Sequence, residues 1–287
     1  ITTMSTSFNH PYSLARTMAT LDHLSGSRAG WNVVTSSEDR AAQNFGMDKI
    51  GLHDARYDRA DEFIDVVKEL WHSWEPDAVV VDHESGVYTD FSKVHTIDHV
   101  GEHFSVRGPL NTMPPLNGDP IICQAGQSSR GREFSARNGE VILASAPGPE
   151  AMKAYRDDIR ARAAALGRDP DSIKIFFLIT PVIGRTKADA EERFAEHLAP
   201  TLERAEETLS MMAGVTEIDF ARFDLDKPRS PGLTCAAPEA VIPEVLRLRF
   251  PGKRVTVFAG RWTAGPAGGV ARPYARCRPD GLGRCLF

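Results

Sequence analysis

Short apolar segments alternate with longer helical patterns along most of the chain, and this alternation limits the fold more than any other feature. Strands are predicted at residues 1–7, 29–35, 120–125, 140–145 and 173–182. Helices are predicted at residues 11–24, 53–75, 128–138, 150–166 and 186–209. Strands that alternate with helices and carry apolar side chains on both faces are typical of a parallel sheet covered by helices. The sequence therefore predicts the α/β class, and the pattern alone fits either a barrel or an open doubly wound sheet.

The segment 53–75 carries the clearest helical pattern. Its apolar side chains recur every three or four residues, which places them on one face of a helix. The segment 78–118 instead contains short alternating runs bounded by glycine, which indicates small strands. We interpret 78–118 as an insertion that serves as a substrate lid, since loops that cover pockets vary most between related proteins.

Composition is that of an ordinary globular protein, with 41% hydrophobic and 25% charged residues among 287. The net charge of −5 gives no reason to expect a nucleic-acid partner. No apolar run approaches the roughly 20 residues that span a bilayer, and no secretory signal is visible. The four cysteines have neither disulfide-framework nor metal-site spacing, and Cys123 is expected in the core. We therefore expect a cytoplasmic protein without a membrane partner.

The two ends of the chain differ from the middle. The chain begins with Ile1 inside a β-like run, from which we expect that residues are missing before it. Residues 229–287 are rich in Pro, Gly and Arg and lose the periodicity of residues 1–228. Two interpretations of this atypical basic tail stay open: a disordered tail, or the product of a shifted reading frame.

The turn after the strand at 120–125 is a candidate phosphate site. It reads Gly-Gln-Ser-Ser from Gly126 to Ser129 and leads directly into a helix. Free amides and the positive end of the helix dipole attract a phosphate at such a turn. The alternative is that Ser128 only caps the helix.

His53 and Tyr57 lie four residues apart, on one face of the helix predicted at 53–75. Both side chains donate hydrogen bonds and the phenol ring packs against planar groups, which suits a ligand with a ring and a phosphate. The alternative is a capping histidine and a half-buried tyrosine. His95, His99 and His103 share the same spacing, but Gly101 and the alternation around it indicate strands, so no metal site is predicted.

A family resemblance runs in order through residues 1–225. It rests on residues 3–8, 11–16, 21–36, 44–46, 53–74, 101–110, 120–137 and 180–186. These segments resemble the bacterial-luciferase-like flavin-dependent monooxygenases, in the branch of nitrilotriacetate and dibenzothiophene-sulfone monooxygenases. The resemblance implies a (β/α)8 TIM barrel in which the strand at Thr3 is not the first. About a hundred residues, which include the first strands, would precede it.

The resemblance also implies a cofactor and a reaction. FMN would contact Thr3, His53, Tyr57 and Ser128, and Asn32 would face the same pocket. His53 is the catalytic candidate, because its hydrogen bond would shield the reacted flavin from futile loss of peroxide. A separate NAD(P)H:flavin reductase would supply reduced FMN, which fits the lack of a Gly-x-Gly-x-x-Gly fingerprint. With O2, the enzyme would oxidise a small organic substrate such as an amine, a polyaminocarboxylate or a sulfur compound.

Three further expectations complete the prediction. The full-length protein is expected to be a homo-oligomer. One alternative function is a truncated, non-catalytic remnant of such an enzyme, because a barrel without its first strands exposes sheet edges. The other is a flavin- or deazaflavin-dependent dehydrogenase on the same fold.

Overall fold

A computed structural model describes residues 1–146, 148–198, 207, 210, 246–250 and 253–257. The chain divides into two compact units. The first comprises residues 1–36 and 54–178, and the second comprises residues 37–53 and 179–287. None of the helices in the described part of the chain combines the length and the apolar character that a bilayer crossing requires.

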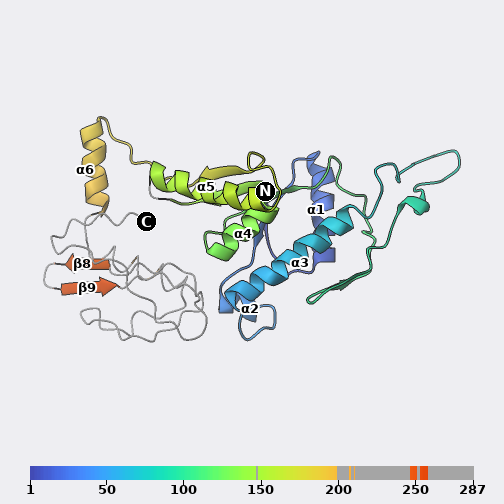
Figure 1. Ribbon diagram of the computed structural model, residues 1–287, viewed down its shortest axis with the longest axis horizontal. Coiled ribbons are helices and arrows are strands. Elements are labelled where there is room, and N and C mark those ends of the chain that lie inside the picture. Colours follow the sequence, from blue (N-terminus) through green and yellow to red (C-terminus); the bar gives the residue numbers. More distant parts are fainter. Residues whose placement is uncertain (147, 199–206, 208–209, 211–245, 251–252, 258–287) are drawn as a thin grey trace. The chain divides into compact units, whose positions relative to one another are not determined.

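The first unit is built on a five-stranded parallel sheet whose strand order follows the chain. Figure 1 labels the helices that connect these strands. Its strands, in spatial order, are β1 (Thr2–Ser5), β2 (Gly30–Val34), β5 (Ile121–Gln124), β6 (Val141–Ala144) and β7 (Lys174–Phe177). The connecting helices are α1 (Pro11–Ser25), α3 (His53–Trp71), α4 (Ser129–Asn138) and α5 (Pro149–Ala165). Each helix returns the chain to the same edge of the sheet, as parallel pairing requires. The predicted α/β alternation is therefore confirmed, although β7 ends at Phe177 rather than at 182.

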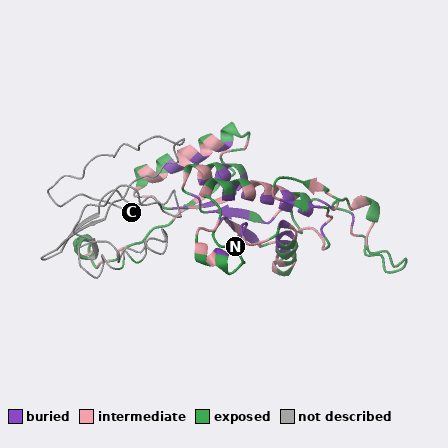
Figure 2. Cartoon of the chain, turned by 90° about the horizontal axis from the view of Figure 1, so that it is seen from below, coloured by how far each residue is buried: buried purple, intermediate pink, exposed green. Residues whose placement is uncertain are grey.

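The core lies between one face of the sheet and the helices, and Figure 2 shows buried positions on the strands and on the inner sides of the helices. Alternate strand residues point to this side. The largest buried side chains of the main cluster are Trp31, Phe63, Trp71 and Phe134. A second cluster, around Ile142 and Ile159, joins β6 to α5. The intervening strand positions point to the other face, where Ile121 and Phe176 are exposed.

Local signals explain the ends of α1. His10 caps its first turn, with Nδ1 accepting a hydrogen bond from the Tyr12 amide at 3.3 Å, and Pro11 supplies a preset φ angle at the first helical position. Gly26 ends the helix with φ 61°, a left-handed conformation that glycine adopts without strain.

The insertion between α3 and β5 contains a short hairpin and an arm. The hairpin pairs β3 (His99–Val100) with β4 (Ser105–Val106), and the arm includes the one-turn helix η1 (Phe91–Lys93). The two sides of the arm meet at its root, where the His95 amide donates to the Ser73 carbonyl at 2.8 Å. Hydrogen bonds join residues of the insertion to α1, to α3 and to other parts of the insertion. Its interpretation as a substrate lid stays a prediction.

The second unit contains the helices α2 (Asp39–Gln43) and α6 (Lys187–Leu198) and the antiparallel strands β8 (Leu246–Phe250) and β9 (Lys253–Val257). Helix α2 lies in a segment predicted as a polar connection; five residues are too few to show a helical apolar pattern. The predicted continuation of α6 to residue 209 lies outside the described residues, apart from position 207. Most of the predicted tail at 229–287, including all three of its cysteines, also lies outside them.

Candidate functional site

The turn between β5 and α4 presents backbone amides at the carboxyl edge of the sheet. Ser128 is the N-cap residue of α4, and its Oγ accepts a hydrogen bond from the Gly131 amide at 2.9 Å. The capping role considered as an alternative is therefore present. The next two amides, of Ser129 and Arg130, have no hydrogen-bond partner within the described part of the chain. A helix start with free amides remains able to bind an anion, because one cap satisfies only part of the first turn.

Tyr57 reaches this turn from the first part of α3. Its side chain is 6% exposed, and its ring packs edge-on against Phe134 of α4 with 5.5 Å between centroids. Gln124, at the end of β5, donates a hydrogen bond from Nε2 to the phenol oxygen at 3.5 Å. The guanidinium of Arg130 lies 5.6 Å from the centroid of the phenol ring. The tyrosine is thus fully packed rather than half-buried, with its hydroxyl at the turn.

Gly131 shows how closely the phenol and the serine approach each other. A β-carbon at this glycine would lie 2.8 Å from Tyr57 Oη and 3.0 Å from both Ser128 Oγ and Gly126 Cα. Because both oxygens lie within 3.0 Å of one point, they are less than about 6 Å apart. The structure therefore brings together two of the four predicted cofactor-binding residues, from two different helices.

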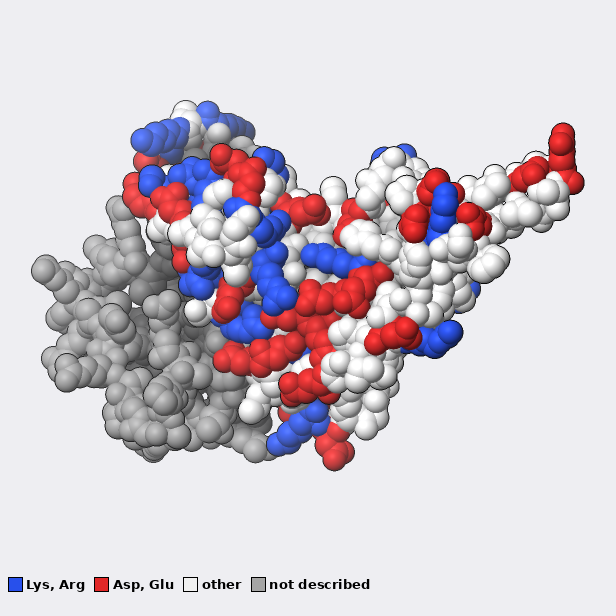
Figure 3. Space-filling view, turned by 45° about the vertical axis from the view of Figure 1, so that its right-hand side comes forward, with Lys and Arg blue, Asp and Glu red and all other residues white. Residues whose placement is uncertain are grey.

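A series of ion pairs holds α3 against α4. Arg130, 18% exposed, pairs with Asp61 and, at 3.0 Å, with Asp58, and Arg137 pairs with Asp65 at 3.0 Å. Burial lowers the pKa of Arg130, but its hydrogen bonds to Asp61 and Asp58 raise that pKa above its ordinary value overall. Figure 3 shows acidic and basic side chains in adjoining groups on one face. These pairs fix the helix that carries Tyr57 relative to the turn.

The other predicted residues occupy two further places. His53 is the first residue of α3, one helical turn before Tyr57. Thr3 and Asn32 are paired neighbours on β1 and β2, and Asn32 donates from Nδ2 to Thr3 Oγ1 at 3.1 Å. Their strand positions put both on the sheet face opposite the helical layer. The Asn32 Oδ1 atom is buried and has no hydrogen-bond partner among the described residues.

Buried polar side chains hold both backbone groups of Gly126. The Gln124 Oε1 atom accepts from the Gly126 amide and from Ser135 Oγ. The Tyr155 hydroxyl of α5 donates to the Gly126 carbonyl at 3.1 Å, and burial raises the pKa of Tyr155 to about 12. Neither Gln124 nor Tyr155 was predicted from the sequence to belong to the site. A glutamine inside the apolar run 120–125 was a visible signal, whereas nothing in the helical pattern of 150–166 distinguished Tyr155.

The three histidines of the insertion do not converge. His95 Nε2 lies 2.8 Å from Glu75, whereas His99 Nε2 lies 3.1 Å from Glu62 of α3. His103 contributes its backbone amide to Glu62 at 2.8 Å. Within the described part of the chain, no group of three or more His, Cys, Asp or Glu residues could hold a metal ion.

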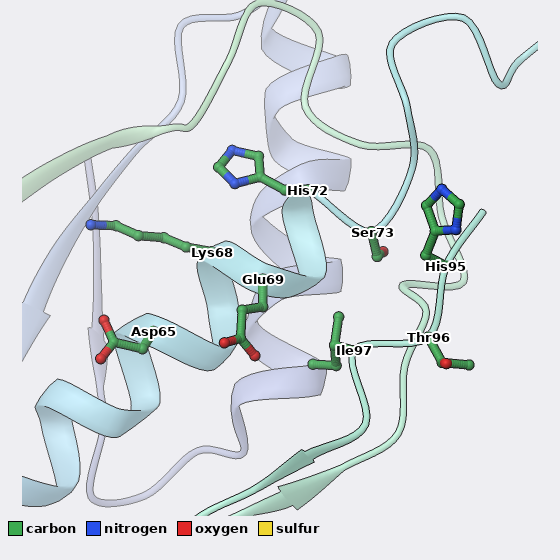
Figure 4. Close-up of a pocket in the computed structure, with 8 residues that line it drawn as sticks. All are labelled: Asp65, Lys68, Glu69, His72, Ser73, His95, Thr96 and Ile97. Carbon is green, nitrogen blue, oxygen red and sulfur yellow. The ribbon is translucent and has the colours of Figure 1, made fainter. Parts of the chain in front are cut away.

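An open pocket of about 580 Å³ lies at the other end of α3 (Figure 4). Its walls come from the last turns of α3 and from the root of the insertion, through Asp65, Lys68, Glu69, His72, Ser73, His95, Thr96 and Ile97. Because Tyr57 is on the first part of α3, this pocket is separate from the turn at Ser128. All of its lining residues except Ile97 have polar or ionisable side chains, unlike the mainly hydrophobic residues that line most ligand pockets.

Comparison with known proteins gives consistent matches. The family model described as "Luciferase-like monooxygenase" matches residues 1–229. Dibenzothiophene-sulfone monooxygenase of Rhodococcus erythropolis is 48% identical over 226 residues, which are 79% of this chain and 49% of that protein. Nitrilotriacetate monooxygenase component A of Aminobacter aminovorans is 40% identical over 231 residues, 79% of this chain and 50% of that protein.

Solved structures give the same result. A crystal structure of riboflavin lyase with modified FMN and riboflavin matches with a TM-score of 0.69 and 41% identity, over 79% of this chain and 50% of that one. The predicted α/β fold, with luciferase-like TIM-barrel relatives, is thus confirmed. The chain spans about half the length of the curated relatives it matches.

Proposed function

Because this chain belongs to the luciferase-like monooxygenase family, we propose that it binds reduced FMN and acts as the oxygenase component of a two-component system. Its substrate would be a small organic amine, polyaminocarboxylate or sulfur compound. Support for this range comes from two relatives, whose names refer to a sulfone and to nitrilotriacetate.

The observation that carries the proposal is the convergence of Tyr57 and Ser128 around Gly131. A serine hydroxyl, a phenol and two amides without partners among the described residues lie at the positive end of α4, and the two side-chain oxygens are less than about 6 Å apart. The absence of a side chain at Gly131 lets the phenol and the serine hydroxyl approach each other this closely. The donor set fits a phosphate monoester, since such groups bind to helix N-termini through amides and hydroxyls. We call Tyr57, Ser128 and the amides of Ser129 and Arg130 the phosphate cradle.

FMN would supply the activation of O2, and the protein would supply binding, orientation and exclusion of water. The phosphate cradle would hold the phosphate end of the cofactor. Thr3 and Asn32 would contact the ring, and Asn32 Oδ1, which has no hydrogen-bond partner among the described residues, would accept from a ring N–H. His53 is included for its position on α3, one turn from Tyr57, where its imidazole would donate to the flavin and limit futile loss of reduced oxygen.

Two partners follow from this proposal. A separate NAD(P)H:flavin reductase would deliver reduced FMN, in keeping with the name "component A" of a relative. We also propose a cytoplasmic location, where reduced nicotinamide is produced, and a homo-oligomer for the full-length protein. Crosslinking of the purified protein with a flavin reductase tests the partnership with the reductase. Light scattering tests the oligomeric state.

Titration of the purified chain with oxidised FMN, and with reduced FMN without oxygen, tests the proposal directly. We expect Ser128→Gly and Tyr57→Phe each to weaken FMN binding at least tenfold. Glycine retains most of the stability of a helix cap while removing the hydroxyl. Tyr88→Phe and Ser92→Ala, both on the arm of the insertion, are matched controls that keep wild-type affinity.

Oxygen uptake with a flavin reductase and a panel of sulfides, sulfones, amines and aminocarboxylates tests the reaction. Product formation coupled to O2 use supports the oxygenase. A chain that binds no FMN refutes the proposal. Substrate oxidation without O2 would indicate the dehydrogenase alternative, and a chain that binds FMN but oxidises nothing would indicate a remnant. A His53→Ala variant that retained both binding and coupling would remove His53 from the site.

A further inference from the structure

We propose that Gln124 is the positioning residue of the phosphate cradle and that it confers preference for a phosphorylated flavin over the same ring without phosphate. This inference rests on the proposed function. Gln124 is 3% exposed and lies at the last position of β5, where it contacts three different elements. It touches no part of the expected ligand and would act through Tyr57 and Gly126.

The two ends of the Gln124 amide have fixed roles. Its oxygen accepts from the Gly126 N–H, which can only donate, and lies 3.2 Å from Ser135 Oγ, whose single hydrogen is shared with the closer Gly131 carbonyl at 2.8 Å. Its nitrogen, which can only donate, therefore faces the Tyr57 phenol oxygen at 3.5 Å. In this contact the phenol oxygen is the acceptor, so its hydroxyl hydrogen is directed away from Gln124. The side chain thus determines how the phenol is oriented as well as where it lies.

The same side chain shapes the turn. Its side chain accepts from the amide of Gly126, two residues further along, and so forms a tight turn directly after β5. The Gly126 carbonyl is held from the other side by Tyr155. Gln127 pairs with the backbone of Ser145, donating at 3.1 Å and accepting at 2.8 Å when its amide is oriented to suit these partners. The turn is therefore fixed before a ligand arrives, which lowers the entropic cost of binding.

Polar side chains are costly inside a buried strand unless every group is satisfied. Ile122 and Cys123, the preceding residues of β5, are buried and apolar. An apolar residue at position 124 would continue this packing without any polar group to satisfy. The glutamine instead joins α3, α4 and the turn at one point, which is the arrangement expected of a residue that supports a binding site.

The test measures the phosphate preference, defined as the dissociation constant for riboflavin divided by that for FMN. Gln124→Glu is nearly isosteric but places a carboxylate oxygen opposite the phenol, so the phenol hydroxyl turns toward it. We expect the phosphate preference to fall at least tenfold at pH 8. Gln124→Met, which has neither donor nor acceptor, is expected to lower it at every pH.

A pH series distinguishes positioning from simple loss of structure. A buried carboxyl has a raised pKa, and its protonated form has a donor again. The phosphate preference of Gln124→Glu, divided by the wild-type value at the same pH, should therefore recover as the pH falls from 8 to 6. Ser73→Ala also removes a buried hydrogen bond, at the far end of α3, and should keep the wild-type preference throughout.

The outcomes separate the two proposals. Wild-type protein that binds FMN no better than riboflavin overturns the phosphate cradle and the proposed function with it. Wild-type protein that prefers FMN, together with a Gln124→Glu variant of unchanged preference, overturns the role of Gln124 alone. Equal loss of FMN and riboflavin binding in both Gln124 variants would also overturn it, because a general structural defect affects both ligands.

Discussion

Replacement of Gly131 by alanine is the most direct test of the packing at the phosphate cradle. In the interior of a helix this change ordinarily stabilises a protein by about 0.5–1 kcal/mol, because alanine loses less backbone entropy on folding. Here the new methyl group would lie 2.8 Å from Tyr57 Oη and 3.0 Å from Gly126 Cα. Relief requires movement of Tyr57, which is packed against Phe134, or of backbone that is held by side chains on both sides.

Overpacking of this kind costs about 1–3 kcal/mol. After subtraction of the gain in helix propensity, we expect Gly131→Ala to lower the free energy of unfolding by about 1–2 kcal/mol. For a chain of this size that corresponds to a fall in melting temperature of about 2–8 °C. FMN affinity should fall at least tenfold, since the phenol and the serine hydroxyl are forced apart.

Circular dichroism melting and flavin titration measure the two effects. Glu133→Ala, at an exposed position of the same helix, is the control and should change stability by less than about 0.5 kcal/mol. A Gly131→Ala protein that melts at or above the wild-type temperature would show that the close approach of α3 to α4 is not as described. Unchanged FMN affinity with lowered stability would show that the phosphate binds elsewhere.

Three further outcomes are expected. Glu62→Gln should loosen the β3–β4 hairpin. Burial alone would raise the pKa of Glu62, but hydrogen bonds from a histidine and two backbone amides lower the pKa overall. The ionised form of Glu62 therefore stabilises the fold. That stabilisation is present above about pH 4.5 and is lost as the pH falls through the lowered pKa, so the difference in melting temperature between wild type and Glu62→Gln should shrink in acid. Tyr155→Phe should lower the free energy of unfolding, measured by urea denaturation, by about 1 kcal/mol. In the ultraviolet pH titration it should remove a tyrosine whose pKa is raised to about 12. If all tyrosines of the wild type were ionised by pH 10.5, the burial of Tyr155 would be contradicted. Arg130→Met should lower the free energy of unfolding by about 1–3 kcal/mol. Arg137→Met, which removes a more exposed ion pair, should lower it by less than about 1 kcal/mol. Equal effects of the two variants would mean that the difference in burial has no energetic consequence.

Most of the sheet and its helices could be predicted because apolar periodicity is a local signal. The helix predicted at 53–75 corresponds to α3, and the strand predicted at 120–125 corresponds to β5. The five residues of α2 carry too short a pattern to be recognised. Residues 178–182 were predicted as strand from their apolar character alone, but in the structure the strand ends at Phe177.

The candidate site was only partly accessible from the sequence. Ser128 and Tyr57 were found because a serine-rich turn and a four-residue helical spacing are visible locally. Their convergence at Gly131 depends on how two helices pack, which no local pattern contains. Gln124 was visible as a glutamine inside an apolar run, but its bond to Gly126 and the bond of Tyr155 to the same residue depend on how the turn folds, so their roles became clear only from the coordinates.

The closed root of the arm has a practical consequence. Because the chain leaves and returns at adjacent backbone positions, near Ser73 and His95, the residues between them can be shortened, lengthened or exchanged without moving the ends of their neighbours. Protein engineers could therefore insert a reporter, an affinity handle or a second folded module there and leave the turn between β5 and α4 undisturbed.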